Sequence, residues 1–487
     1  MELQSDQLFR MLPQVGEILV RPNFVALQRD YSRKLVVESL RSALEDLRNE
    51  LKDGRYSEDS LEAELLGLDR NVERRLQRAT QTSLRRVINA TGVILQTNLG
   101  RAPLSAAAVQ HISEIAGGYS NLELDLKTGE RGHRDMHVRQ MILDVLALHS
   151  NLAREGFAGK AATVVNNCAA ACFLALNSLA EGGEVIVSRG ELVEIGGGFR
   201  VPDILRKSGA VLREVGATNR TRLADYEAAI TPATKLILRV HRSNFRMEGF
   251  TERPDLEELR DLGRRASVPV FEDQGTGAIV NLQHFGISSD SSFIRSITRG
   301  IDLVACSGDK LLGGPQCGIL FGAESLIEQV RKNPLFRAMR VDKLTYAALE
   351  ETLLAYLRGA EESLPAIQMM SLSLDAVQKR CLVMADALRL MGVSVEVVNT
   401  RSVVGGGTTP GDSLPSFAVS LCHSSETESA FAARLRNLSP PVMARTNEGR
   451  VLLDLRTVPA DEDEALKRLL AEAIKGADGI RQVEEQS

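Results

Sequence analysis

From about residue 88 onward, short β-branched runs alternate with stretches of helical length. The runs are TVV (163–165), EVIVS (184–188), AVLREV (210–215), KLILRV (235–240), VPVFED (268–273) and LVACS (303–307). Strands separated by helix-length segments form mostly parallel sheets, because each crossover helix returns the chain to the end of the sheet at which the previous strand began. The sequence therefore predicts a doubly wound α/β sheet. Ligands of such sheets bind beyond the carboxyl ends of the strands, so chemistry is expected in the residues that follow each run.

Two further regions flank this sheet. In residues 1–87, apolar residues recur at helical spacing, beginning with Val36 and Leu40, which predicts a small helical domain. Residues 346–487 begin with a helical run and continue with strand-like segments, which predicts a small C-terminal α/β domain. The large sheet domain then covers residues 88–345.

Composition narrows the class of protein. The 487 residues are 44% hydrophobic and 25% charged, which is typical of a globular protein and argues against disorder. The net charge of −5 gives no nucleic-acid signal, although such binding needs only a local basic surface. Six scattered cysteines, without a Cys-x-x-Cys pair, favour free thiols over a zinc site, so no metal is expected. With no secretory signal and no membrane span in view, we expect a cytoplasmic protein without a membrane partner.

The end of the helical region is rich in arginine. The cluster consists of Arg70, Arg74, Arg75, Arg78, Arg85 and Arg86. Charge runs usually form solvated helix faces, but a local basic surface can also contact a polyanion. The sequence alone leaves both interpretations open.

Two of the predicted strand ends carry groups that could bind a ligand. Asn167, Cys168 and Ala169 follow TVV and open an apolar helix, whose exposed N–H groups and dipole favour a phosphate. A plain strand-to-helix turn would look the same. Asp273 follows VPVFE and precedes a glycine turn. An acid at this place could ligate a metal, hold a cationic ring nitrogen or cap a turn.

The third strand end carries Asp309 and Lys310, which follow LVACS among small and apolar residues. Lysine is normally a surface residue, and a desolvated lysine has a lowered pKa and can form a Schiff base as a free amine. One helix-bearing crossover separates Asp273 from Lys310, so neighbouring strands can present both. A phosphate cradle, an acid for a pyridinium nitrogen and a lysine together meet the needs of pyridoxal 5′-phosphate.

At this level of detail the chain resembles a known family, the bacterial selenocysteine synthases (L-seryl-tRNA(Sec) selenium transferases). These are fold-type I pyridoxal-phosphate enzymes. The resemblance extends over nearly the whole chain and rests on long strings of low degeneracy. They are VINATGVILQTNLGRAPLS (87–105), YSNLELDLKTGERGHRD (119–135), VVNNCAAA (164–171), SRGELVEIGGGFRVPDIL (188–205), VGATNRT (215–221), SGDKLLGGPQCG (307–318) and RAMRVDK (337–343).

The resemblance implies roles for the residues of the three strand ends. Lys310 is the expected Schiff-base lysine and Asp273 the partner of the pyridinium nitrogen. The phosphate cradle is expected to consist of Asn167, Cys168 and Ala169.

The resemblance also implies how the substrates are handled. Arg101, Arg337 and Arg340 are expected to bind the anionic selenium donor, and Asp309 is expected to act as a catalytic acid. The implied reaction converts seryl-tRNA(Sec) to selenocysteinyl-tRNA(Sec) with selenophosphate, through a dehydroalanyl intermediate. Residues 1–87 would dock the tRNA, and the implied assembly is a decamer of five dimers.

Some features near the expected site leave questions open. His241 follows a predicted strand, and a cofactor contact and a purely structural role are about equally supported. The family usually has Asp-Leu-Gly-Ser-Gly where this chain has DQGTG (273–277), and His-Thr-Ser-Asn where it has HRSN (241–244). Substrate preference could therefore differ, with Gln274 and Arg242 as the main changes. The loop at 405–416 (GGGTTPGDSLPS) could close over the site or be a turn-rich linker.

Two other functions compete with the selenium transferase. One is a pyridoxal-phosphate lyase that acts on a small amino acid or amino sugar phosphate. The other is a non-catalytic RNA-binding or assembly protein with the same fold. Lys310 and Asp273 argue against the non-catalytic protein. The arginine-rich helical region argues against the lyase, whereas the two differences from the family pattern favour retaining the lyase as an alternative.

Overall fold

The computed structural model describes residues 8–196, 198–287, 292–391, 393–421 and 426–484, so Cys422 lies outside the described residues. The chain divides into two compact units, Met1–Arg86 and Val87–Ser487, and each is described by itself. Within the described ranges, no helix has both the length and the apolar character that a membrane span requires.

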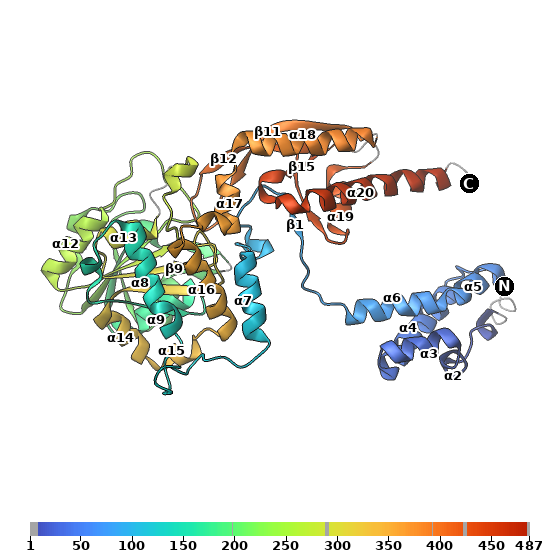
Figure 1. Cartoon of the computed structure of the whole chain (residues 1–487), viewed down its shortest axis with the longest axis horizontal. Coiled ribbons are helices and arrows are strands. Elements are labelled where there is room, and N and C mark those ends of the chain that lie inside the picture. The colour runs from blue at the N-terminus through green and yellow to red at the C-terminus, as the bar shows by residue number, and fades with distance from the viewer. Residues whose placement is uncertain (1–7, 197, 288–291, 392, 422–425, 485–487) are drawn as a thin grey trace. The chain divides into compact units, whose positions relative to one another are not determined.

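The first unit is helical (Figure 1). Its helices are α2 (Val15–Leu19), α3 (Pro22–Asp30), α4 (Arg33–Lys52), α5 (Glu58–Leu66) and α6 (Leu68–Thr80). Ser32 caps α4, because its side chain accepts a hydrogen bond from the backbone of Leu35. The buried faces of α4 and α6 supply most of one apolar core, and this core contains only residues of the first unit. The unit therefore has a hydrophobic core of its own.

The second unit is built on a seven-stranded sheet with the strand order β2-β10-β9-β8-β7-β3-β6. The strands are β2 (Lys160–Val165), β3 (Glu184–Ser188), β6 (Val211–Val215), β7 (Thr234–Val240), β8 (Val270–Gly275), β9 (Leu303–Ser307) and β10 (Gly318–Ala323). Strand β10 pairs antiparallel with both neighbours, and the pairs among β9, β8, β7, β3 and β6 are parallel. The prediction of a mostly parallel sheet is confirmed, although β10 was not foreseen.

Helices cover both faces of this sheet (Figure 1). One face carries α8 (Met136–Ser150), α12 (Leu256–Ala266), α13 (Phe293–Thr298) and α16 (Lys343–Leu357); the other carries α9 (Cys168–Ala180), α10 (Val201–Lys207) and α14 (Glu324–Lys332). Successive strand residues alternate between the two cores: Ile237 and Val270 belong to the first, and Leu238 and Phe271 to the second. By this alternation, Asp273 faces the α9 side and its neighbours on β8 face the α12 side.

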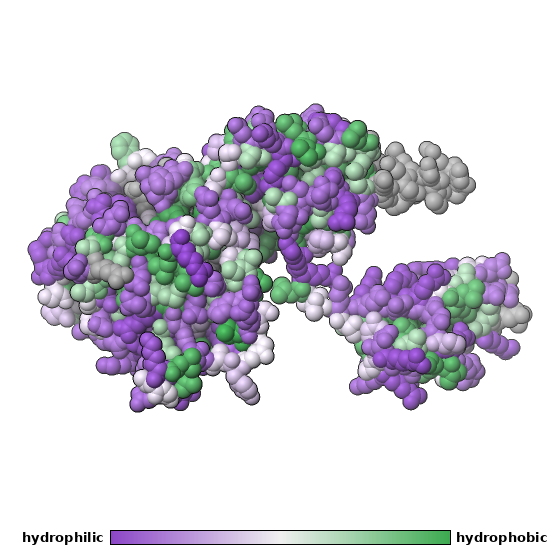
Figure 2. Space-filling model, viewed as in Figure 1, coloured by the Kyte–Doolittle hydropathy of each residue, from purple (hydrophilic) through white to green (hydrophobic). Residues whose placement is uncertain are grey.

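The last part of the chain forms a four-stranded antiparallel sheet with the order β11-β12-β15-β14. Its elements are α17 (Pro365–Ser371), α18 (Leu374–Leu390), β11 (Val395–Val403), β12 (Ser413–Leu421), α19 (Glu428–Arg436), β13 (Val442–Met443), β14 (Arg445–Asn447), β15 (Arg450–Asp454) and α20 (Asp463–Glu484). The remaining elements of the unit include β1 (Ile88–Asn89), α7 (Ala106–Ala116), β4 (Glu194–Gly196), β5 (Phe199–Arg200), α11 (Leu223–Ala229) and α15 (Pro334–Ala338). Figure 2 shows that the visible surface of the chain is mostly hydrophilic.

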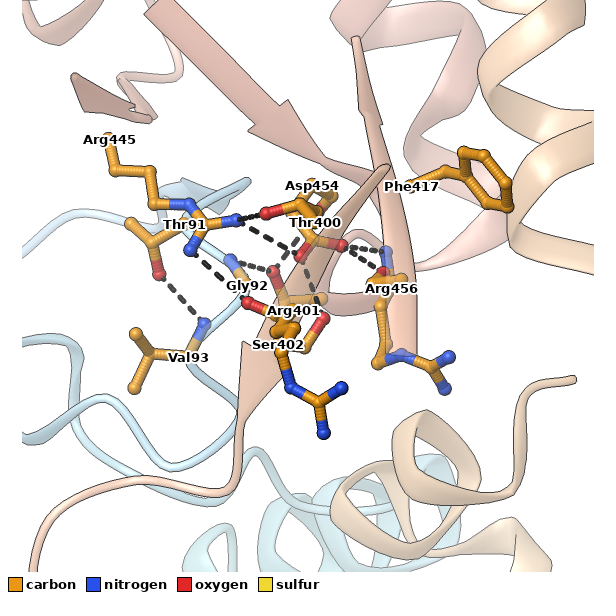
Figure 3. A network of polar contacts seen from close by, with 12 residues as sticks. Thr91, Gly92, Val93, Thr400, Arg401, Ser402, Phe417, Arg445, Asp454 and Arg456 are labelled. Carbon is orange, nitrogen blue, oxygen red and sulfur yellow. Dashed lines mark hydrogen bonds and ion pairs between the residues drawn. The ribbon is translucent and has the colours of Figure 1, made fainter. Parts of the chain in front are cut away.

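A buried carboxylate ties the start of this unit to its C-terminal sheet (Figure 3). Asp454 is fully buried and accepts hydrogen bonds from the hydroxyl groups of Ser402 (2.7 Å) and Ser416 (2.8 Å). Gly92, with a positive φ of 73°, passes so close to Asp454 that a side chain there would collide with the carboxylate. Its N–H group also donates to the hydroxyl of Thr457. The segment that leads toward Arg101 is thereby fixed against the C-terminal sheet.

Candidate active site

The turn between β2 and α9 forms a cradle of backbone N–H groups. The Asn167 side chain caps α9 by accepting a hydrogen bond from the Ala170 N–H at 2.7 Å. Strand β10 passes so close at Gly318 that a side chain there would collide with the Asn167 backbone. None of the hydrogen bonds among the described residues uses the N–H groups of Cys168 or Ala169. These two groups can therefore donate to an anion at the positive end of the α9 dipole.

Asp273 lies near the end of β8 and pairs in register with Ala305 of the neighbouring strand β9. The Cys168 thiol donates to Asp273 Oδ1 at 3.6 Å, so the carboxylate lies beside the cradle. Burial raises the pKa of Asp273, and the positive charge of Lys310 opposes this effect. The thiols of Cys168 and Cys172 and a carboxylate oxygen of Asp273 lie within 4.8 Å of one another. Such a carboxylate can pair with a cationic ring nitrogen, and the trio could also hold a metal ion.

Lys310 follows β9 and is buried, with 7% of its surface exposed. Burial lowers the pKa of its amine, whereas the nearby Cys168 and Asp273 act in the opposite direction. A Cβ atom placed on Gly275 would lie 3.7 Å from Asp273 Oδ1 and 3.8 Å from Lys310 Nζ. The carboxylate and the amine therefore face the same space at the end of β8, as expected for groups on neighbouring strands.

The sequence did not predict which residue of the glycine loop would contact Lys310. Lys310 Nζ donates a 2.7 Å hydrogen bond to the carbonyl oxygen of Gly407, in the loop between β11 and β12. Gly407 has a φ of 80°, and a Cβ atom there would lie 3.0 Å from Lys310 Nζ. Of the two interpretations of the glycine loop, the structure supports the one in which the loop reaches the site. The run of three glycines was the sequence signal for this close approach.

Asp309 and Arg101 form an ion pair next to Lys310. Arg101 Nη1 donates to Asp309 Oδ2 at 2.7 Å, and the Ala102 N–H donates to the Asp309 carbonyl. Asp309 is buried, and Arg101 has a positive φ of 64°, which is uncommon for a residue other than glycine. This backbone conformation turns the arginine toward the lysine strand. Arg101 and Asp309 are thus brought close to Lys310.

Arg337 lies in the last turn of α15, and Arg340 follows that helix. The carbonyl of Met339 accepts a hydrogen bond from the Asn166 N–H at 2.9 Å, which places this turn beside the cradle. Arg337 is exposed, and Arg340 Nη1 lies 3.5 Å from Glu123 Oε1. Hydrogen bonds from two further arginines lower the pKa of Glu123 to about 2. Among the described residues, no hydrogen bond or ion pair connects Arg337 or Arg340 to the lysine or to the Arg101 pair.

His241 follows β7, and its backbone N–H donates to the Asp273 carbonyl at 2.9 Å. Burial lowers the pKa of His241 to about 3, with further contributions from the positive charges of Arg253 and Lys310. The imidazole is therefore neutral at physiological pH. Its side chain lines a cavity on the α12 face of the sheet.

Gln274 and Arg242, which differ from the family pattern, line this same cavity. Gln274 holds the turn after β8, because its Oε1 accepts hydrogen bonds from the N–H groups of Thr276 (3.1 Å) and Gly277 (3.2 Å). Arg242 donates from Nε to the Gly190 carbonyl at 3.1 Å. Both differences therefore lie at the cavity on the α12 face of the sheet, whereas Asp273 faces the α9 side.

Comparison with known proteins gives matches along almost the whole chain. The family described as L-seryl-tRNA selenium transferase matches residues 87–459, and the one described as selenocysteine synthase N terminal matches residues 9–48. The L-seryl-tRNA(Sec) selenium transferases of Aquifex aeolicus and Geobacter sulfurreducens are each 42% identical to it, over 96% of this chain and 99% of their own length. Among solved structures, D-glucosaminate-6-phosphate ammonia-lyase matches 83% of this chain and 99% of its own, with a TM-score of 0.56 and 18% identity, which shows a shared fold.

Proposed function

The chain belongs to the L-seryl-tRNA selenium transferase family, and on this basis we propose that it converts seryl-tRNA(Sec) to selenocysteinyl-tRNA(Sec) with selenophosphate as donor. The observation that carries the proposal is the placement of Asp273 and Lys310 at the ends of neighbouring strands, beside a phosphate cradle, in a chain that matches this family throughout. The lyase alternative has less support, because the full-length relatives are named as selenium transferases.

The residues present fit pyridoxal phosphate, the cofactor of this family. Lys310 would hold its aldehyde carbon, Asp273 would pair with its ring nitrogen, and the N–H groups of Cys168 and Ala169 would bind its phosphate. When bound, the cofactor supplies an electron sink that stabilises negative charge on the Cα atom of the substrate. The backbone N–H of His241 donates a hydrogen bond to the Asp273 carbonyl and so helps to fix the position of Asp273.

Lys310 and Asp309 are the proposed proton carriers. As a free amine, Lys310 would take the proton from the seryl Cα, a task helped by its lowered pKa. Asp309 then gives a proton to the seryl hydroxyl, which leaves as water. Asp309 accepts a hydrogen bond from Arg101 in this structure, so its acid role requires Arg101 to turn away, for example toward the donor anion.

The donor is a compact anion that guanidinium groups can bind through paired hydrogen bonds. We assign Arg101, Arg337 and Arg340 to this donor. To bind it, Arg101 would leave its ion pair with Asp309, and Arg340 would leave its contact with Glu123. Because no hydrogen bond or ion pair among the described residues of one copy connects Arg337 or Arg340 to Lys310, we propose that two copies complete the site. This agrees with the homo-oligomer of dimers, a decamer, that the resemblance implies.

The tRNA would dock on the first unit. Arg70, Arg74 and Arg78 are exposed and recur every four residues along α6, so they lie on one face of the helix. No ion pair or side-chain hydrogen bond among the described residues engages their guanidinium groups, whereas Arg75 is bound to Asp46 at 2.7 Å. Unpaired guanidinium groups along one face suit the phosphates of a nucleic acid.

We further propose that the enzyme acts in the cytoplasm, since the cysteines that the structure describes are all free thiols. The function is tested with the purified full-length protein, pyridoxal phosphate and selenophosphate, offered either seryl-tRNA(Sec) or free serine. We expect conversion of the charged tRNA alone. Conversion of free serine or of an amino sugar phosphate, with the charged tRNA left unchanged, would favour the lyase instead.

A further inference from the structure

A cavity of about 580 Å³ lies at the carboxyl ends of β7 and β8, on the face of the sheet opposite to Asp273. It is unusually rich in arginine. The arginines that line it are Arg239, Arg242, Arg246, Arg253 and Arg295. Two of these guanidinium groups pair with carboxylates, Arg239 with Glu191 (3.3 Å) and Arg246 with Glu248 (3.3 Å). The remaining positive charge of the wall would suit a ligand that carries negative charge.

The acidic residues of the cavity wall compensate these charges only in part. Glu252 is bound by Arg220 (2.8 Å) and Arg222 (3.3 Å), neither of which lines the cavity. Asp255 caps the start of α12. Glu272 is buried, which raises the pKa of its carboxyl group and favours its neutral form. Asp412, from the glycine loop, completes the acidic set.

Two arginines in the wall have guanidinium N–H groups that lack a strong hydrogen-bond acceptor. Arg253 makes no hydrogen bond or ion pair within the described part of the chain, and desolvation together with the charge of Arg239 lowers its pKa to about 10. Arg242 uses Nε on the Gly190 carbonyl, while its Nη1 has only the weak acceptor Met247 Sδ at 3.9 Å. Arg242 is half-buried and Arg253 is exposed, and a bound anion would neutralise both guanidinium charges.

The cavity shares a wall with the candidate active site. The loop that places the Gly407 carbonyl on Lys310 continues to Pro410 and Asp412, which line the cavity. A Cβ atom on Gly411 would lie 3.6 Å from the side chain of Arg246, so the loop also touches the arginine wall. An anion that draws the arginines together would therefore move the segment that holds Lys310.

We propose that this cavity is a second oxyanion site, which takes a phosphate group on Arg242 and Arg253 and is coupled to Lys310 through residues 405–412. The source of the phosphate rests on the proposed function: it is either the 3′-terminal nucleotide of the tRNA or the phosphate released from the selenium donor. The apolar side chains of Phe245 and Met247 in the wall offer a surface for a base.

The test uses isothermal titration calorimetry on the full-length protein. The protein is first loaded with pyridoxal phosphate, so that the phosphate cradle between β2 and α9 is occupied. Inorganic phosphate and adenosine 5′-monophosphate are titrated separately into the wild type, Arg253→Gln and Arg242→Gln. Arg265→Gln is the matched control, because Arg265 is exposed on α12 and does not line the cavity. Arg337→Ala separates this site from the proposed donor site.

We expect saturable binding that weakens at least about tenfold in Arg253→Gln and Arg242→Gln, as the loss of a charge-assisted hydrogen bond implies, and is unchanged in Arg265→Gln and Arg337→Ala. Tighter binding of the nucleotide identifies the tRNA end as the source, and equal or tighter binding of phosphate identifies the donor product. Binding that is absent, or that persists unchanged in Arg253→Gln with an unaltered unfolding midpoint, overturns the site.

The coupling has a separate measurement. Saturating phosphate should shift the pH midpoint of the visible absorbance band of the loaded enzyme, and Arg253→Gln should abolish the shift. A spectrum that stays constant while phosphate binds overturns the coupling. Neither measurement uses seryl-tRNA, so failure of the transferase assay and failure of this proposal are distinguishable.

Discussion

Lys310 Nζ donates a 2.7 Å hydrogen bond to the carbonyl oxygen of Gly407, 97 positions further along the chain. The amine belongs to the end of β9, and the carbonyl belongs to the loop between two strands of the C-terminal sheet. This contact holds the buried amine with a polar partner, since a buried donor without one is costly. It also makes the C-terminal sheet part of the candidate site.

Replacing Asp273 with Asn should leave cofactor binding detectable but reduce turnover by orders of magnitude. The amide cannot hold a positive ring nitrogen as a carboxylate does, so the electron sink is weakened. The measurement is turnover at saturating cofactor, with Asp386→Asn on the exposed face of α18 as the control. Turnover near that of the wild type would remove Asp273 from the mechanism.

Replacing Arg337 or Arg340 with Ala should raise the donor concentration needed for half-maximal rate while sparing exchange of the seryl Cα proton with solvent. The arginines are assigned to the anionic donor, and proton removal is assigned to Lys310. Proton exchange is followed in deuterated water. Loss of exchange with an unchanged donor requirement would place these arginines in the elimination step instead.

Replacing Arg70, Arg74 and Arg78 together with Ala should weaken tRNA binding and make the slope of log affinity against log salt about 2–3 units shallower, because fewer counterions are released. The cofactor spectrum should not change, since α6 belongs to a separate unit. The control removes Lys34 and Arg48 of α4, which already pair with Glu38 and Glu45. Equal effects of both sets would contradict docking on α6.

His241 should make the protein less stable in acid. Its pKa is about 3 in the folded chain, against 6.5 for an ordinary histidine, so the unfolded chain binds one more proton between these values. The free energy of unfolding should therefore fall as the pH is lowered from 6.5 toward 3, with a contribution of up to about 1.4 kcal/mol per pH unit. Unfolding in urea at several pH values measures this slope.

His241→Asn should flatten that slope, and His284→Asn, at an exposed position, should leave it as in the wild type. Identical slopes in the wild type and His241→Asn would show that the imidazole is not buried in its neutral form.

The parallel sheet could be predicted because its pattern is local: buried runs alternate with helix-length segments along the chain. Asp273 lies near the end of β8 and Lys310 follows β9, and these two strands are neighbours in the sheet. Strand β10 escaped prediction. It follows β9 after a short Gly-Pro loop without a crossover helix, so the alternation that revealed the other strands is missing there.

The partners of the site residues could not be predicted in the same way. Arg101 and Asp309 stand 208 positions apart, and their contact depends on how the segment fixed by Asp454 lies over the large sheet. The Gly407 contact likewise depends on the packing of the C-terminal sheet. Such contacts follow from tertiary arrangement, which residue types and spacing do not encode locally.

Selenium transfer to the seryl group should depend on Lys310. The most direct measurement is the mass of the aminoacyl group on tRNA(Sec) after incubation with cofactor and selenophosphate, for the wild type, Lys310→Ala and the exposed-lysine control Lys332→Ala. We predict selenocysteine with the wild type and Lys332→Ala, and unchanged serine with Lys310→Ala. Selenocysteine formed by Lys310→Ala at the wild-type rate would rule out the role of Lys310, and serine left unchanged by the wild type would rule out the transferase function.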